Sequence, residues 1–448
     1  MGILLQYFAA FSSALGALSA GTALGWTSNL QHKIVFFSDY GFKVTEVEFS
    51  LLGSMLNLGA ASVCVLTGFM INYFGRRGTM LLVLIPFILG WCLLITAINV
   101  TMLIIGRALI GMACGACCVS CPVYVGEIAD KEIRGKLGSF FQLLITTGIM
   151  LVFILGAYNS SQITSSVCAF IPLLFGFCIF FCPESPAFYV MKGKHDKAMI
   201  SLKRFRGKST DLYAELNSLI EEEELRMSQN VKAALRKKSS MKAMIIACGL
   251  MFFQQLSGIN AVIFYTTTIF KDAKIEIKPE LATIIVGVIQ VLATFVATLT
   301  VDKIGRKMLL IISDVFMALC TLMLGTYYGL KESNEESVKG YGWISLLSLC
   351  VFIIAFSLGF GPVAWIMIGE IFSSDVKGFA GSMAGTINWS LAFAVTAVYP
   401  TIRELIGPSL CFLIFTILST LGILFSIFIV PETKGKSLAE IQQNLEGK

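Results

Sequence analysis

A group of amide side chains lies inside an apolar stretch of the chain. The stretch 243–270 contains no charged residue, yet its middle reads QQLSGIN, with Gln254, Gln255 and Asn260. Polar groups without partners are costly in hydrocarbon, so these side chains should face other helices or a ligand path. Amides both donate and accept hydrogen bonds, which suits the hydroxyl groups of an uncharged polyol. Gly258 weakens the helix between them, and a broken helix is a frequent feature of transporter substrate sites.

Further amide and indole side chains occur within other apolar stretches. They are Gln142, Gln290, Trp365, Asn388 and Trp389. The face of a Trp ring covers the apolar C–H side of a sugar. A charged substrate would need a counter-charge at mid-membrane, and the central stretches of the second half offer only Asp314, near a helix end. Packing between helices explains any single amide equally well, but the group together favours a site for a neutral sugar.

The composition is typical of a membrane protein. Of 448 residues, 56% are hydrophobic and 14% charged, whereas soluble domains carry about 25% charged residues. The mean hydropathy is +0.80. A bilayer-spanning helix needs about 20 apolar residues. Twelve such stretches are predicted, near residues 6–28, 50–72, 79–98, 102–122, 137–157, 163–182, 244–270, 281–301, 308–329, 342–369, 379–402 and 409–430.

Basic residues gather in the short loops on one side of these spans, as in Arg76-Arg77 and Arg306-Lys307. The positive-inside rule then predicts cytoplasmic N- and C-termini. The net charge of +6 is modest, and its distribution suits membrane orientation better than nucleic-acid binding. We therefore expect a multi-pass protein of the cell membrane that contacts the lipid bilayer.

Three motifs occur twice in the same order, which predicts two homologous halves. NYFGRRG recurs as VDKIGRK, GEIADKEIRG as GEIFSSDVKG, and PESP as PETKG. Parallel repeats are a common plan of transporters. We predict an all-α membrane fold of twelve transmembrane helices in two six-helix halves. The predicted divisions are a first half over 1–182, a linker of short cytoplasmic helices over 183–243, a second half over 244–430, and a short cytoplasmic tail over 431–448.

The charged residues of the repeated motifs are predicted to form a cytoplasmic gate. In both copies a Glu leads a basic residue by seven positions, Glu127 and Arg134 in the first half and Glu370 and Lys377 in the second. Ion pairs between the two halves would form in one state and break in another, and a switch requires such differential contacts. A simpler interpretation, as topology signals and helix caps, stays open.

The motifs together resemble the signature set of the sugar porter family of the major facilitator superfamily. The set comprises GRR, PVYVGEIADKEIRG, PESP, QQLSGINAVIFY, VDKIGRK, GPVAW and VPETKG, and it extends from Gly75 to Gly435. It looks most like that of insect facilitated trehalose or hexose transporters and of facilitative glucose transporters. The resemblance implies that a sugar is bound by Gln142, Gln254, Gln255, Asn260, Gln290, Trp365, Asn388 and Trp389. It also implies that the inner gate is formed by Arg76, Arg77, Glu127, Arg134, Arg306 and Glu370.

The chain departs from the family pattern at several positions. Ala364 stands where Pro is usual, and Lys307 and Lys377 stand where Arg is usual. Lys cannot form the bidentate pair that Arg forms with a carboxylate. These departures concern the flexing of one helix and the strength of the gate.

Facilitated diffusion of a trehalose or hexose by alternating access is the preferred function. Proton-coupled members of the family carry an Asp in the first helix, but the only acid before Tyr40 is Asp39, outside that span. A proton-coupled symporter using Asp314 or Glu127 is an alternative, although we expect Asp314 to pair with a basic neighbour. A non-transporting sugar receptor is another, disfavoured by the short tail.

An enzyme is disfavoured, since no nucleophile, phosphate loop or acid pair appears. The run CGACCVSC is interpreted as tight helix packing. We expect no cofactor, no metal, no nucleic acid and no obligate protein partner.

Overall fold

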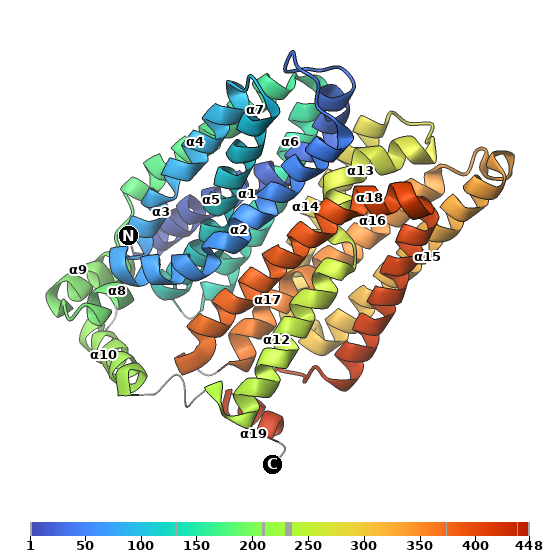
Figure 1. Ribbon diagram of the computed structural model, residues 1–448. Helices are drawn as coiled ribbons and strands as arrows, with labels where there is room; N and C mark the ends of the chain where they lie inside the picture. Colours follow the sequence, from blue (N-terminus) through green and yellow to red (C-terminus); the bar gives the residue numbers. More distant parts are fainter. Residues whose placement is uncertain are drawn as a thin grey trace.

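The computed structural model describes residues 2–130, 132–207, 211–228, 235–372, 374–436 and 438–446. Within these ranges the regular structure is helical, and the long helices run side by side in one elongated bundle (Figure 1). Both termini lie at the same end of the bundle, together with the short helices α8, α9, α10 and α19 (Figure 1). We call this the terminal end, and the opposite end, with the loops 36–45, 274–278 and 334–342, the distal end.

The first half consists of the helices that precede the linker. Their bounds are α1 Gly2–Val35, α2 Glu46–Phe74, α3 Arg76–Leu82, α4 Leu84–Ile95, α5 Val100–Ile128, α6 Arg134–Tyr158 and α7 Ser161–Phe180. Glycines allow close crossings: a Cβ at Gly111 of α5 would lie 2.0 Å from the Leu56 carbonyl oxygen of α2. A Cβ at Gly21 of α1 would lie 2.1 Å from the Ile145 carbonyl oxygen of α6. Such small residues let membrane helices pack backbone to backbone.

The remaining helices form the linker, the second half and the tail. The linker contains α8 Pro186–Met191, α9 His195–Arg206 and α10 Leu212–Ser228. The second half contains α12 Lys238–Leu256, α13 Ile259–Ala273, α14 Pro279–Ile304, α15 Arg306–Ser333, η1 Glu335–Val338, α16 Trp343–Leu358, α17 Phe360–Ile371 and α18 Ser374–Phe428, followed by α19 Leu438–Glu446. The predicted start of the second half at 244 lies within α12. The division into four segments stays a prediction.

Eleven described helical segments are long and apolar enough to cross a membrane. The last of them, Gly378–Phe428, has 51 residues, far more than the about 20 that one crossing needs. Its helical geometry is interrupted at Gly407, where φ is 83° and ψ is 158°, and Pro408 follows. The segment therefore turns back at Gly407 and supplies two spans. This break reconciles the eleven segments with the twelve spans predicted.

A buried arginine ties three helices of the first half together. Arg107 of α5 is fully buried, and its Nη1 donates to the Ala23 carbonyl of α1 at 2.7 Å. Its Nε donates to the Leu52 carbonyl of α2 at 3.3 Å, and the guanidinium lies 5.3 Å from the Trp26 ring centroid. Trp26 in turn donates to Ser165 Oγ of α7 at 3.0 Å. A buried charge needs such partners, so we assign Arg107 a structural role.

Candidate functional site

The predicted helix break occurs within QQLSGIN. Helix α12 ends at Leu256 and α13 begins at Ile259. Gly258 between them has a φ of 90°, and a Cβ there would also lie 2.8 Å from the Phe415 ring. Only glycine adopts this left-handed backbone without strain. Across the break, Asn260 Nδ2 donates to Gln255 Oε1, so the two amides form a pair.

Gln254 connects the broken helix to two other helices. Its Nε2 donates to the carbonyls of Phe360 at 2.9 Å and Gly361 at 3.1 Å, at the start of α17. Its Oε1 accepts from Asn388 Nδ2 of α18 at 2.7 Å. The Gln254 side chain is only 3% exposed, so both ends of a buried amide have partners. The structure thus brings Gln254, Gln255, Asn260 and Asn388 together around the break.

The two predicted tryptophans lie on the helices that Gln254 contacts, Trp365 on α17 and Trp389 on α18. Trp365 of α17 is 39% exposed, and its Cη2 would lie 3.9 Å from a Cβ at Gly385. Gly385 is three residues before Asn388, on the same face of α18. Trp389 is buried and packs against Ala60 of α2, so it projects from the second half onto the first. Its Nε1 has no hydrogen-bond partner among the described residues.

Gln142 and Gln290 lie on two helices that pack across the halves. Gln142 is on α6 and Gln290 on α14, and a Cβ at Gly287 of α14 would lie 3.2 Å from Met150 Cα of α6. Gln290 is buried and Gln142 half-buried. Neither side-chain amide makes a hydrogen bond within the described part of the chain. Among the described residues, neither side chain forms a hydrogen bond with the Gln254 group.

The charged motif of the first half forms a compact network at the terminal end. Arg76 Nη2 donates to Glu127 Oε1 at 2.6 Å, and its Nε donates to the same oxygen at 3.0 Å. Ser185 Oγ donates to the other oxygen of Glu127. Glu184, in PESP, accepts from the backbone N–H groups of Arg76 and Arg77 at 3.0 Å each. The GRR loop is therefore held by two carboxylates.

The second half repeats this network residue by residue. Arg306 Nη2 donates to Glu370 Oε1 at 2.9 Å, and Thr433 Oγ1 donates to Glu370 Oε2 at 2.5 Å. Glu432 accepts from the backbone N–H groups of Arg306 at 3.0 Å and Lys307 at 3.1 Å. Sequence analysis did not single out Glu184 and Glu432 as site residues, although the PESP and PETKG repeat was the signal for them.

The two equivalent glutamates differ in electrostatics. Burial raises the pKa of Glu184, although backbone N–H donors oppose this shift. For Glu432 burial acts in the same direction, but donation from the N–H groups of Lys434, Arg306, Lys307 and Thr433 prevails and lowers its pKa. Hydrogen bonds to the charged form favour ionisation, and desolvation disfavours it. Glu432 is therefore the glutamate that the fold stabilises as a carboxylate.

The predicted pairing of these residues between the halves is not present in this structure, and it stays a prediction for another state of the protein. In the described part of the chain, each ion pair joins two residues of the same half: Arg76 with Glu127 in the first half, and Arg306 with Glu370 in the second. Each pair joins the turn between two successive helices to the end of a further helix of the same half, the α2–α3 turn to α5 and the α14–α15 turn to α17. Arg77 donates instead to the Phe180 carbonyl at 2.6 Å, and Arg134 to the Ala129 carbonyl at 3.5 Å. The side chain of Lys377 lies outside the described residues.

The hydrogen bonds that join the halves lie at and toward the distal end, among the residues described. Thr267 of α13 contacts Ser28 Oγ at 3.2 Å and donates to Asn29 Oδ1, both on α1. Thr268 donates to Gln31 at 2.8 Å. Two further contacts join α2 to α18: Ser50 with Ala397 O at 3.2 Å and Asn57 with Thr396 Oγ1 at 3.0 Å. We call the Ser28–Asn29–Thr267 contact the distal latch. Sequence patterns did not reveal it.

Asp314 does not have the basic partner that we expected. It lies on α15, it is 1% exposed, and neither carboxyl oxygen has a hydrogen-bond partner in the described chain. A Cβ at Gly422 of α18 would lie 2.8 Å from Asp314 Oδ2. An unpartnered buried carboxylate is costly as an anion, so the prediction of an ion pair at Asp314 is wrong.

Comparison with known proteins agrees with this geometry. A family model described as "Sugar (and other) transporter" matches residues 6–445. The chain belongs to this family of transporters. It is thus an integral multi-pass membrane protein, and the predicted family resemblance is confirmed.

Two mosquito members of the family illustrate the similarity. "Facilitated trehalose transporter Tret1" of Aedes aegypti is 40% identical over 446 residues, covering 99% of this chain and 55% of that protein. The Culex quinquefasciatus protein of the same name is also 40% identical, with 99% of this chain and 86% of that protein covered. The chain thus spans about half the length of the first of these relatives and most of the second.

Solved structures of the family share the fold. The proton:xylose symporter XylE bound to 6-bromo-6-deoxy-D-glucose aligns with a TM-score of 0.81 and 25% identity, covering 99% of this chain and all of that one. A partially occluded inward-open conformation of XylE from E. coli aligns with a TM-score of 0.79 and 26% identity, covering 97% and 99%. The predicted all-α, twelve-helix fold in two halves is thereby confirmed.

Proposed function

We propose that this member of the family carries out facilitative transport of a neutral sugar, trehalose or a hexose, by alternating access. The observation that carries the proposal is the group of uncharged amides around the α12–α13 break. Gln254, Gln255, Asn260 and Asn388 can exchange their mutual hydrogen bonds for bonds to sugar hydroxyls. Related proteins named facilitated trehalose transporters support this substrate class.

The remaining predicted contacts complete the proposed site. Trp365 is partly exposed beside α18 and would stack on the sugar ring. Trp389 would close the site from its place between the halves. Gln142 and Gln290 would add hydrogen bonds from α6 and α14, because their amides are not taken up by the described protein groups. Binding would draw the two halves together around the sugar.

The proposed cycle uses two kinds of contact. In this structure the distal latch holds the halves together, while the described ion pairs at the terminal end remain within each half. Opening of the distal end breaks the latch and brings the terminal ends of the halves together. The ion-paired turns with Arg76, Glu127, Arg306 and Glu370 then meet across the halves as rigid surfaces, and Arg77 and Arg134 contribute charge there. The transport step itself needs no covalent chemistry and no cofactor.

The terminal end is proposed to face the cytoplasm of a cell that carries the protein in its plasma membrane. The basic loops with Arg76, Arg77, Arg306 and Lys307 lie at this end, together with the linker helices, and the positive-inside rule places such loops on the cytoplasmic side.

Uptake of radiolabelled trehalose and glucose into proteoliposomes tests the proposal. Wild type is compared with Trp365→Ala, and with Trp343→Ala as a control, since Trp343 lies in the same half at the start of α16. We expect saturable uptake of one sugar, lost in Trp365→Ala and kept in Trp343→Ala. Binding without uptake in the wild type would instead indicate a receptor.

Proton-coupled symport is the second candidate. Asp314 favours it, because it is a buried carboxylate without a partner among the described residues, and such a group is suited to hold a proton. The fold match to a proton:xylose symporter also leaves the coupling mode to experiment. Uptake at pH 5.5 several-fold above that at pH 7.5, abolished by a proton ionophore, would establish symport. Equal uptake at both pH values supports facilitated diffusion.

A further inference from the structure

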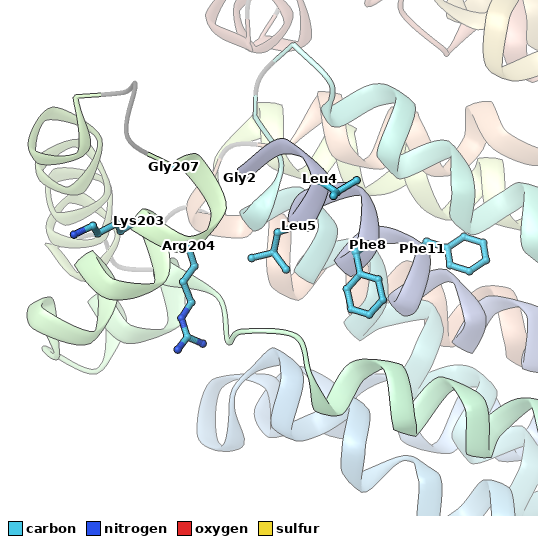
Figure 2. A pocket seen from close by; sticks show the side chains of 8 residues that line it. All are labelled: Gly2, Leu4, Leu5, Phe8, Phe11, Lys203, Arg204 and Gly207. Atoms are coloured by element: carbon cyan, nitrogen blue, oxygen red, sulfur yellow. The ribbon is translucent and has the colours of Figure 1, made fainter.

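A groove on the outside of the bundle lies where the start of α1 meets the short helix α9 (Figure 2). Its volume is about 930 Å³. Leu4, Leu5, Phe8 and Phe11 of α1 form one wall, and helix α9 contributes Lys203 and Arg204 to the other. In Figure 2 the Arg204 side chain extends beside the groove, and the end of the Lys203 side chain points away from α1. Leu4 is 75% exposed, and Phe8 and Phe11 are exposed as well. Because α1 spans the membrane, this apolar wall faces lipid.

The two walls are held in a fixed relation. The buried side chain of Gln6 donates to the Phe205 carbonyl of α9 and to Asp130 Oδ2, both at 2.8 Å. Arg206 of α9 pairs with Asp130 at 2.8 Å and with Glu215 at 2.7 Å. Helix α9 is thus attached to α1 through Gln6, to the end of α5 through Asp130, and to α10 of the linker through Glu215. The groove is therefore a preformed feature of the bundle.

The basic wall is not neutralised by the described protein. Arg206 has two carboxylate partners, whereas the exposed side chains of Lys203 and Arg204 form no ion pair in the described part of the chain. Both residues lie next to the start of α1, the first span, where the polar surface of a bilayer begins. A cationic pair beside an apolar wall at this depth matches a molecule with an anionic head and a hydrocarbon tail.

We propose that this groove binds one anionic phospholipid. The phosphate binds the Arg204 guanidinium, which can donate two parallel hydrogen bonds to it, and Lys203 adds positive charge on the same helix. One acyl chain follows Leu4, Phe8 and Phe11 along α1. Each basic side chain near an anionic membrane surface contributes a favourable interaction, so the groove prefers an anionic to a zwitterionic head. The proposal does not depend on the transported substrate.

Native mass spectrometry of the purified full chain tests this site. The protein is titrated with phosphatidylglycerol or with phosphatidylcholine, and bound lipids are counted. We expect the first phosphatidylglycerol to bind about 30-fold more tightly than phosphatidylcholine, from two surface charges. Lys203→Gln with Arg204→Gln should remove this preference.

Two further variants distinguish the groove from general surface charge. Lys237→Gln with Lys238→Gln removes two exposed charges at the start of α12, outside the groove, and should keep the preference. Leu4→Trp fills the groove, keeps the charges and should weaken the first binding of both lipids. Equal loss in the Lys237/Lys238 variant, or no loss in the Lys203/Arg204 variant, overturns the proposal. A dimer mass that Leu4→Trp abolishes would assign the groove to a second copy of the chain and also overturn it.

Discussion

Removing the Thr267 hydroxyl should open the distal end of the transporter. Thr267 is buried, and its hydroxyl makes two hydrogen bonds to α1 in the other half, to Ser28 and Asn29. The Asn29 amide is itself held by donation to the Phe153 carbonyl at 2.6 Å, so it cannot turn to another partner. With about 1 kcal/mol net for each bond, Thr267→Val costs the closed state about 2 kcal/mol. The open state loses little, because water solvates these groups there.

A cost of about 2 kcal/mol shifts the equilibrium toward the distal-open state about 30-fold. Spin labels on Val47 of α2 and Leu405 of α18 report it, because both residues are 76% exposed and lie in different halves at the distal end. Labels introduced as non-canonical amino acids avoid the 13 native cysteines. The distance distribution from electron–electron double resonance should gain a longer component in Thr267→Val.

Thr266→Val is the matched control. Thr266 is equally buried on the same helix, but its hydroxyl donates to the Val262 carbonyl of its own helix. It should leave the distance distribution unchanged. An unchanged distribution in Thr267→Val, or an equal shift in both variants, would refute the assignment of the distal latch as the contact that holds the halves together.

Three further predictions concern single side chains. Gln254→Leu removes the donor to α17 and the acceptor of Asn388, and should weaken sugar binding about tenfold in a calorimetric titration; unchanged affinity would exclude Gln254 from the site. Asp314→Asn should leave uptake equal at pH 5.5 and 7.5 and should not lower the unfolding temperature, because no donor among the described residues serves either oxygen; loss of uptake would give Asp314 a role in coupling. The lowered pKa of Glu432 stabilises the fold above the ordinary pKa of 4.5, and this contribution is lost as the pH falls through the lower folded-state pKa. Melting scans should therefore show wild type losing more stability than Glu432→Gln between pH 6 and pH 3.5, and parallel curves would contradict this.

Much of the architecture could be read from local patterns. Apolar stretches of bilayer length predict spans, because an α-helix forms all the hydrogen bonds of its backbone N–H and C=O groups within the segment that crosses the lipid. Gly258 predicts the break in the seventh span, because glycine tolerates a positive φ; in the structure its φ is 90°. Repeated motifs predict the two halves, and the equivalent networks of Arg76 and Arg306 follow from them.

Contacts between distant segments were decided only by the tertiary structure. The amide of Gln254 contacts Asn388 because α17 and the first span of α18 both pack against α12. The spacing of these residues in the sequence does not reveal that they are close in space. The gate residues pair within the halves because each Arg lies in a short turn next to a Glu of its own half. Since the same motif occurs in both halves, the sequence alone cannot distinguish such a pair from one across the halves. The distal latch is made of Ser, Asn and Thr side chains, which membrane helices also use for ordinary packing. Residue types and order thus determined the spans, the repeat and the family, whereas the partner of each polar group depended on how the helices cross.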